Sequence, residues 1–553
     1  MLKELFSFQN GKDFALGFTQ LDFWLFFLLV MAIFSFLHKS NLMKTIFITA
    51  VSLFFYFKTS GASVLILSFS ILFNYLLGQS IFSIKENWKK KALMITAVSV
   101  NVLILAYFKY AYFFTESFNA LFQTNYQAFN YFAQWTSGIN GEGSLVDKII
   151  VPAGVSFFTF QSISYILDIY RQEIKPVKNF FEYSFFITFF PHILLGPIAR
   201  AKDFIPQINQ PFSLDKSSFS WAIFQIVKGL VKKLVLADYI ATHFVDKVID
   251  APESYPGFLS IIAMWAYSLQ IYGDFSGYTD ITTGVARLMG FELFQNFNSP
   301  YKALNVADFW RRWHRSLGAW LRNYLYIPLG GNKSGGIGTH VSIFIIFVFL
   351  IFITQWYDLF LIYLGLMSIY VIGVFISPKF KNLVHRDMNL LITMIVGGLW
   401  HGPSQNFVMC GAMNGLALIF YNYWKQVSPY EAKTNKVATF WKIFITFNFI
   451  TFTRIWFILQ DKNAPFNFLK NIYYQFNLSV ETFSKAIWTY QTAFIILVIG
   501  FIIHWLPQNL KDKALGIFSK TPMIVQIVTV ALTIFFIYQA VSDESKGFVY
   551  FQF

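Results

Sequence analysis

Two histidines lie in apolar, aromatic surroundings where an imidazole could do acid–base chemistry. His401 lies in VGGLWHGPSQNF (396–407), and His314 lies in DFWRRWHRSLGAW (308–320). A neutral imidazole can accept a proton from a hydroxyl group, and ionisable groups within a membrane usually have a function. Each histidine could instead be a buried packing residue satisfied by a hydrogen bond. The two are far apart in the sequence, so only the fold could bring them together.

The residues around His401 predict an interrupted helix. Gly397, Gly398 and Gly402 remove side-chain bulk. Pro403 lacks a backbone donor and biases the residue before it away from helix. Backbone that leaves a helix at membrane depth is tolerated only where it is buried in protein or lines a cavity. We therefore expect His401 to face a cavity.

The stretch around His314 predicts one helix over 308–331, lying in the membrane interface. At about 100° per residue, aromatic and leucine side chains share one arc that includes Trp313 and His314. Asp308 and the arginines gather on the opposite side. We expect His314 to point into the protein, and Arg311 and Arg315 to face lipid headgroups or an anionic ligand.

The composition places these residues in a polytopic membrane protein. The chain has 553 residues, of which 56% are hydrophobic, 21% aromatic and only 13% charged, far from a soluble composition. The formal net charge of +15 is spread over short basic clusters between apolar runs, which favours lipid headgroups over nucleic acid as partners. Cys410 is the single cysteine, which excludes an intramolecular disulfide and a thiolate zinc site.

The apolar runs predict an all-α chain with about 11 to 13 transmembrane helices plus re-entrant and interfacial helices. They form one membrane domain over residues 1–553, with a motif core at about 150–421. The candidate spans are 19–37, 43–57, 62–83, 92–114, 150–168, 181–198, 218–242, 257–272, 340–355, 357–377, 389–421, 438–459, 486–506 and 522–540.

The basic loops predict the orientation in the membrane. With the amino terminus outside, 38–44, 83–91 and 170–179 fall in the cytoplasm, and the Lys- and Arg-free loop 115–147 falls outside. This distribution follows the excess of basic residues on cytoplasmic loops. Residues 1–17 lack the features of a secretory signal, so we expect the first span to be retained.

Other polar residues in apolar settings are weaker candidates. Asp274 and Asp280 could orient a histidine or close an internal salt bridge, because buried carboxylates are costly unless paired. Arg454 could be a partner for such a carboxylate or could line a tunnel. The loop 328–338 is rich in glycine but is not a Walker motif. It could lie near the phosphates of a donor, although a plain connection is the simpler reading.

Six stretches together resemble the membrane-bound O-acyltransferase (MBOAT) family, in the bacterial branch that contains alginate O-acetylation proteins, peptidoglycan O-acetyltransferases and teichoic-acid D-alanylation proteins. Within that branch the resemblance favours the alginate O-acetylation proteins. The stretches are VPAGVSFFTFQSISYILDIYR (151–171), FFPHILLGPIAR (189–200), QIYGDFSGYTDITTGVARLMGF (270–291), NFNSPYKALNVADFWRRWHRSLGAWLRNYLYIPLGGN (296–332), GGLWHG (397–402) and GFVYFQF (547–553).

The resemblance implies a ring of tilted helices around a central tunnel open to both membrane faces. His401 matches the catalytic histidine of the family, and His314 matches a second, upstream active-site position. From the sequence itself we also expect Trp400, Asn414, Asp274, Trp313, Arg311, Arg315 and Arg454 to line the substrate path. The family commonly has a WGALHG-like stretch after the histidine motif, whereas this chain has CGAMNG (410–415). The departure leaves the reaction class intact and bears on the identity of the acceptor.

The implied activity is transfer of an acyl group, most simply acetyl, to hydroxyls of an extracytoplasmic polysaccharide. The donor would be a cytoplasmic thioester, either acetyl-CoA or a carrier-protein thioester, with no tightly bound cofactor and no metal. A periplasmic or surface partner resembling SGNH hydrolases would complete delivery, and the chain would lie in the inner membrane of a bacterium. Two alternatives stay open: D-alanyl transfer, and a transporter or scaffold without enzymatic activity.

Overall fold

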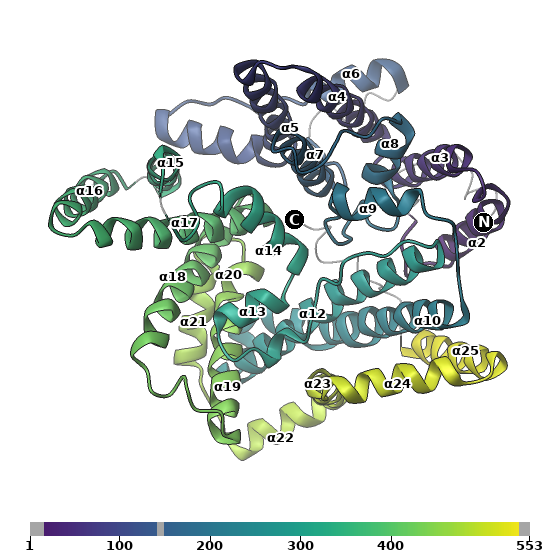
Figure 1. The fold of residues 1–553 in the computed structure, drawn as a ribbon. Helices are drawn as coiled ribbons and strands as arrows, with labels where there is room; N and C mark the ends of the chain where they lie inside the picture. The colour runs from purple at the N-terminus through teal and green to yellow at the C-terminus, as the bar shows by residue number, and fades with distance from the viewer. Residues whose placement is uncertain (1–15, 141–148, 334, 355, 541–553) are drawn as a thin grey trace. The chain divides into compact units, whose positions relative to one another are not determined.

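The computed structural model describes residues 16–140, 149–333, 335–354 and 356–540, and every regular element in these ranges is a helix (Figure 1). The prediction of an all-α membrane protein is confirmed. The terminal stretch 547–553, quoted above for the family resemblance, lies outside the described residues.

Three helical segments are long and apolar enough to cross a membrane by length and composition, or four if one bent pair is a single span. They are Asn41–Ser83, Asn87–Phe122 and Asp358–Ile376, and the bent pair is Val480–Thr489 with Gln491–Trp505. This search covered only the part of the chain that the structure describes. The larger number of spans expected from the sequence stays a prediction.

The helices group into two compact units, each assembled from segments far apart in the sequence. Unit 1 consists of Met1–Val102, Pro152–Ser299 and Phe468–Phe553, and unit 2 consists of Leu103–Val151 and Pro300–Asn467. The expectation of a single membrane domain stays a prediction.

Unit 1 holds the amino-terminal, central and carboxyl-terminal helices. They are α2 (Leu21–Leu37), α3 (Asn41–Ser60), η2 (Gly61–Ser63), α4 (Val64–Ser83), the start of α5 (Asn87–Phe122), α7 (Val155–Tyr170), α8 (Phe180–Thr188), α9 (Ala201–Ile208), α10 (Lys216–Leu230), the π-helices η4 (Val231–Asp238) and η5 (Ala241–Val245), α11 (Asp246–Asp250), η6 (Pro252–Ser254), α12 (Gly257–Leu288), the end of α21 (Ala464–Tyr474), α22 (Val480–Thr489), α23 (Gln491–Trp505), α24 (Gln508–Lys520) and α25 (Met523–Ala540).

Small residues let α10 and α12 pack with their backbones in contact (Figure 1). A Cβ built on Gly229 would lie 2.6 Å from the carbonyl oxygen of Gly277, and one on Gly284 would lie 2.7 Å from that of Ala222. Glycine and alanine allow this close approach between helices in a membrane protein. The seam continues into η4, where polar side chains face α12.

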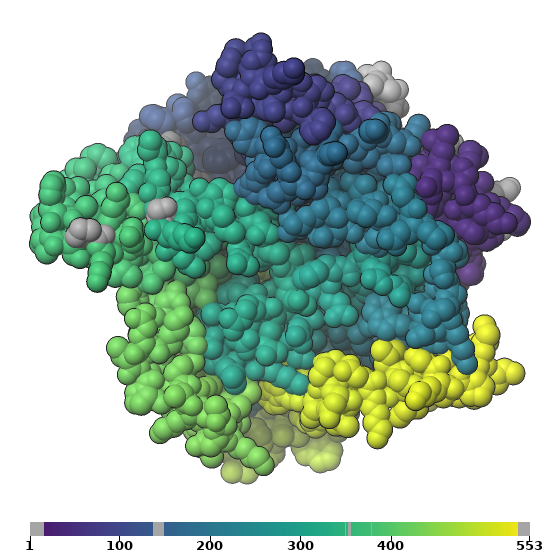
Figure 2. All heavy atoms as spheres, in the orientation of Figure 1, coloured from purple at the N-terminus to yellow at the C-terminus, as the bar shows by residue number. Residues whose placement is uncertain are grey.

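The helices near the carboxyl terminus are largely exposed. α24 buries none of its residues, and Figure 2 shows the α24–α25 segment, in yellow, running along the surface. In unit 2, α16 also buries none, and its Leu361 and Phe375 are 66% and 87% exposed. The extended apolar surface of α16 suits contact with lipid.

Unit 2 holds both histidines singled out from the sequence. Its elements are the end of α5, α6 (Tyr131–Asn140), η7 (Pro300–Lys302), α13 (Val306–Arg312), α14 (Arg315–Leu321), the π-helix η8 (Arg322–Tyr326), α15 (Ile337–Thr354), α16 (Asp358–Ile376), α17 (Pro378–His401), α18 (Gln405–Val427), α19 (Lys436–Thr453), α20 (Ile455–Ile458) and the start of α21.

Candidate active site

His401 is the last residue of α17, and the chain turns immediately after it. Gly402 has an extended backbone, and α18 begins at Gln405 with the Ser404 side chain accepting a hydrogen bond from the backbone N–H of Asn406. The interrupted helix predicted from Pro403 is confirmed. Because proline lacks an N–H and restricts the residue before it, α17 cannot continue through this point.

The turn after His401 is tied to the segment that follows α20. The Asn406 amide donates to the carbonyl oxygens of Leu459 and Asp461 at 2.8 and 3.0 Å. The Ser404 hydroxyl donates to the carbonyl of Gln460 at 3.3 Å. Backbone that has left a helix therefore finds its hydrogen bonds within unit 2, as membrane-embedded backbone must.

Glycines bring α17 and α18 together beside His401. A Cβ on Gly398 would lie 2.3 Å from the carbonyl oxygen of Phe407, and one on Gly411 would lie 2.4 Å from that of Met394. A Cβ on Gly397 would meet only Leu321 Cδ1, at 3.1 Å. The glycines predicted to clear space around His401 thus serve chiefly to pack the two helices, with Gly397 the more open position.

The helix predicted over 308–331 is not continuous. α13 ends at Arg312, Trp313 is extended, and His314 takes a left-handed backbone conformation with φ 41° and ψ 54° before α14 begins. The prediction of one continuous helix is wrong here. No glycine or proline marks the break, so the periodic pattern of aromatic residues alone indicated an uninterrupted helix. The expected burial still holds, because His314, Trp313 and Trp320 are 1%, 5% and 8% exposed.

Trp400 lies against both histidines. Its ring centroid is 4.9 Å from that of His401 and 5.6 Å from that of His314, each in an edge-on arrangement. His401 is half-buried and also meets Phe457 at 4.9 Å. The fold therefore gathers His314, Trp400 and His401 into one aromatic cluster. Two imidazoles on a shared indole could accept or relay a proton from a hydroxyl group.

Lys109 and Tyr110 are additional residues at this cluster. Lys109 Nζ donates to the Trp400 carbonyl at 2.7 Å, and the Tyr110 hydroxyl donates to the Leu399 carbonyl. Neither residue was predicted as a site residue from the sequence. A signal was present, since Lys109 is a charged residue inside the candidate span 92–114, and such residues are functional candidates by default.

Arg454 lies in an aromatic cage of unit 2. Its guanidinium carbon is 4.6 Å from the ring centroid of Trp313 and 5.2 Å from that of Tyr301, whose hydroxyl accepts a hydrogen bond from Arg454. Guanidinium groups stack well on aromatic faces. This contact places Trp313 and Arg454 together, with Arg454 6% exposed.

Asn414 is buried among hydrogen-bond partners on three elements. It accepts from Trp310 Nε1 at 3.3 Å and donates to the Cys410 carbonyl at 2.9 Å and to Thr453 Oγ1 at 3.2 Å. These contacts join α13, α18 and α19. Asn414 thus uses its amide within the protein.

The two arginines beside His314 differ in exposure. The Arg311 side chain is 71% exposed and lies 3.5 Å from Asp308. Arg315, the first residue of α14, is half-buried. The exposed position of Arg311 agrees with the predicted polar face.

Asp274 and Asp280 form ion pairs within unit 1. Lys233 Nζ lies 2.6 Å from Asp274 and 2.8 Å from Asp238, with all three side chains largely buried. Asp274 was expected either to orient a histidine or to close an internal salt bridge, and in the structure it forms the salt bridge.

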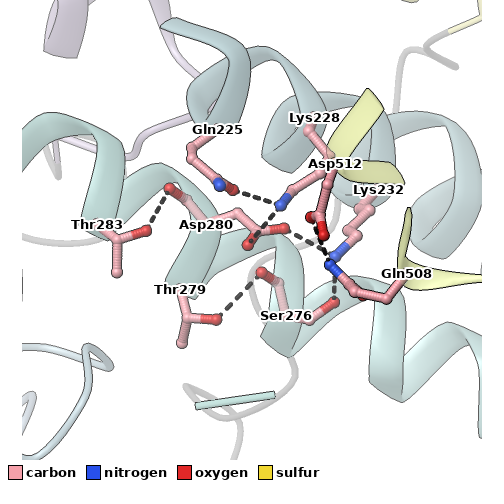
Figure 3. Close-up of polar contacts among 9 residues, drawn as sticks. All are labelled: Gln225, Lys228, Lys232, Ser276, Thr279, Asp280, Thr283, Gln508 and Asp512. Atoms are coloured by element: carbon pink, nitrogen blue, oxygen red, sulfur yellow. Dashed lines mark hydrogen bonds and ion pairs between the residues drawn. The ribbon is translucent and has the colours of Figure 1, made fainter. Parts of the chain in front are cut away.

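Asp280 binds two lysines, as Figure 3 shows. Lys232 lies at 2.7 Å and Lys228 at 3.2 Å, and Lys232 also donates to Ser276. Buried or half-buried charges require such partners. These contacts join α10 and η4 to α12 along the small-residue seam.

A groove of about 500 Å³ opens in unit 1, and its lining includes Lys44, Asp215, Arg287 and Glu292. Its charged groups bond one another or nearby protein atoms: Arg287 pairs with Glu292 and Ser218, and Lys44 donates to the Ile208 carbonyl. The groove contains neither histidine. Among the residues that the structure describes, no group of three or more His, Cys, Asp or Glu side chains could hold a metal ion.

Comparison with known proteins gives a family match and several relatives. The model of MBOAT, the membrane-bound O-acyltransferase family, matches residues 5–353, which include His314 and end before His401. A peptidoglycan O-acetyltransferase of Helicobacter pylori is 30% identical over 466 residues, covering 78% of this chain and 74% of that protein.

Two further relatives are covered over less of their length. A probable alginate O-acetylase AlgI of Pseudomonas putida is 32% identical over 352 residues, covering 63% of this chain and 59% of that protein. A teichoic acid D-alanyltransferase of Bacillus subtilis is 26% identical over 305 residues, covering 54% of this chain and 66% of that protein.

Proposed function

Because this chain belongs to the membrane-bound O-acyltransferase family, it is an acyltransferase, and we propose that it moves an acetyl group from a cytoplasmic thioester to hydroxyls of an extracytoplasmic polysaccharide. The donor is acetyl-CoA or a carrier-protein thioester, and no tightly bound cofactor takes part. The chain lies in the inner membrane of a bacterium with its amino terminus outside. The observation that carries the proposal is the His314–Trp400–His401 cluster at the break between α17 and α18.

In the proposed reaction, His401 accepts the proton of the acceptor hydroxyl. The hydroxyl oxygen attacks the thioester carbonyl carbon, the carbon–sulfur bond breaks, and the sulfur leaves as a thiol after receiving a proton. Positioned general bases typically contribute about 10² to 10⁴ in rate. Alternatively, a ring nitrogen of His401 could first take the acyl group from the thioester and then pass it to the acceptor hydroxyl. The products, a thiol and an ester, are the same. His314 orients the donor or the acceptor.

The surroundings of His401 support this role physically. Its ring lies against Trp400 and Phe457, and the residue is half-buried. Ordered neighbours restrict the ring to few orientations, so little entropy is lost when the reacting atoms meet. A partner resembling SGNH hydrolases would pass the acyl group on to the polymer.

D-alanyl transfer is the second candidate, favoured by the similarity to the Bacillus subtilis teichoic acid D-alanyltransferase. It would use the same histidines with a D-alanyl carrier-protein thioester as donor. The two candidates therefore differ in donor and acceptor, and share the chemistry at His401.

The test is transfer of labelled acyl groups by purified protein in liposomes. Radiolabelled acetyl-CoA and a D-alanyl carrier protein are offered separately, with alginate, peptidoglycan fragments or teichoic acid as acceptor and with the expected partner resembling SGNH hydrolases added. We expect acetyl transfer by the wild type and a loss of at least about 100-fold in His401→Ala. His243→Ala is the matched control, since His243 bonds the Tyr239 carbonyl in unit 1. Equal transfer by wild type and His401→Ala would overturn the assigned base, and transfer from the D-alanyl donor alone would select the second candidate.

A further inference from the structure

α5 brings a lysine to the end of the helix that carries His401. α5 is one of the three segments long and apolar enough to cross a membrane, and a lysine in such a segment is costly unless it finds a partner. Lys109 Nζ donates to the Trp400 carbonyl at 2.7 Å. The next residue, Tyr110, donates its hydroxyl to the Leu399 carbonyl. Two consecutive residues of α5 thus bond two consecutive carbonyls of α17.

These carbonyls belong to the last turn of α17, where no N–H group of the helix is available to bond them. The last four carbonyls of an α-helix have no intrahelical N–H partner, and Pro403 cannot supply one. The Leu399 carbonyl also accepts from Gly402 N–H at 3.1 Å. A cation at a helix carboxyl terminus is favourable both as a donor and through the helix dipole. Lys109 therefore stabilises the turn that ends at His401.

Lys109 also contacts the side chain that lies between the two histidines. Its ammonium group is 6.0 Å from the ring centroid of Trp400, within the range of a cation–π contact. That ring lies against His401 at 4.9 Å and against His314 at 5.6 Å. The lysine thus contacts both the backbone and the indole of Trp400, a residue that both imidazoles contact.

We propose that Lys109 is a positioning residue for acyl transfer, which holds Trp400 and the last turn of α17 so that His401 meets its substrate in one orientation. The inference rests on the proposed function of His401. Lys109 acts through Trp400 and does not itself react. Since a misplacement of about 1 Å can cost about 100-fold in rate, loss of this contact should appear mainly in kcat.

Three variants separate positioning from folding. Lys109→Met keeps an apolar stem and removes the ammonium group, whereas Lys109→Arg keeps a cation and several donors. Lys442→Met is the matched control in the same unit, because Lys442 Nζ also donates to backbone carbonyls, those of Glu431 at 2.6 Å and Lys433 at 3.0 Å. All are compared in the liposome assay described above.

We expect Lys109→Met to lower kcat by about 10- to 100-fold, with KM for the donor within about twofold of wild type. Lys109→Arg should recover at least about tenfold of the lost rate, and Lys442→Met should stay within about twofold. A wild-type kcat in Lys109→Met would overturn the inference. So would equal losses in Lys109→Met and Lys442→Met, because those would reflect general destabilisation.

Hydrogen–deuterium exchange gives a readout that does not depend on activity. The backbone N–H groups of 396–402 and 404 should exchange faster in Lys109→Met than in wild type, and should be unchanged in Lys442→Met, because only the first variant releases the end of α17. Unchanged exchange in Lys109→Met would overturn the inference. If the wild type transfers no acyl group, the proposed function fails, and exchange alone decides whether Lys109 holds this turn. If Lys109→Met does not fold, Lys109→Gln, which removes the charge and keeps a polar side chain, takes its place with the same readouts.

Discussion

The imidazole of His314 lies edge-on to the indole of Trp400, with ring centroids 5.6 Å apart and an angle of 63° between the planes. The imidazole of His401 lies against the same indole. Trp400 is 5% exposed, so the cluster is packed rather than open to solvent on that side. Changes at any of the three rings should therefore affect the other two.

His314→Asn should separate the role of the ring from that of the backbone. Asparagine tolerates the left-handed conformation better than other non-glycine residues, so the turn between α13 and α14 should persist. We expect acyl transfer to fall by about 10- to 100-fold while the thermal midpoint of the purified protein changes little. His314→Ala should show the same loss of rate and an added destabilisation of about 1 kcal/mol. Full activity in His314→Asn would remove this imidazole from the reaction.

Gly398→Ala and Gly397→Ala form a matched pair on α17. A methyl group at 398 meets the backbone oxygen of Phe407 at 2.3 Å, whereas one at 397 meets the flexible end of Leu321 at 3.1 Å. Gly398→Ala should therefore destabilise the protein by about 1 to 3 kcal/mol, and Gly397→Ala by clearly less. Chemical unfolding in mixed micelles measures both, and equal effects would contradict the close packing of α17 on α18.

Lys233→Met should be among the most damaging substitutions in unit 1. It would leave the buried carboxylates of Asp274 and Asp238 beside each other without the ammonium group, at a cost of about 3 to 5 kcal/mol. In Lys233→Met/Asp274→Asn one of those charges is removed, so the double variant should be less destabilised than the sum of the single variants. A double-mutant cycle measured by chemical unfolding tests this coupling, and additive effects would show that the pair does not interact.

Asp215 predicts a pH dependence at the start of α10. Hydrogen bonds from the Ser218 side chain and from the Ser218 backbone N–H lower the pKa of Asp215 below its ordinary value. A lowered pKa means that the charged carboxylate stabilises the fold above the ordinary value, and that this contribution is lost as the pH falls through the folded-state pKa. The difference in thermal midpoint between wild type and Asp215→Asn should thus shrink between about pH 6 and about pH 3. A constant difference would mean that the charge at this cap has no effect.

The sequence could predict features that depend on one residue's own chemistry. Pro403 lacks a donor wherever it stands, so the end of α17 near His401 could be read directly. The break at His314 could not be predicted in this way. Its left-handed backbone is held by buried surroundings, and the residues next to it in the sequence do not indicate such a conformation. The predicted burial of His314 was correct even though the helix around it was not.

The long helix α12 shows the same limit. The apolar run suggested a span over 257–272, yet α12 continues to Leu288. Asp274 and Asp280 interrupt the apolar pattern, but their charges are met by lysines of α10 and η4. The π-helical turns of η4, which carry Lys232 and Lys233, were not foreseen either. The length of such a helix therefore depends on partners that lie far away in the sequence.

The hydrogen bonds of Asn406 to Leu459 and Asp461 tie two loops that are distant in the chain. A hybrid built from this protein and a relative would therefore have to exchange 402–406 and 459–461 as a set. A crossover point between the two segments would combine loops from different proteins. The hydrogen bonds between them would then be lost, and the turn that directly follows His401 would lose its support.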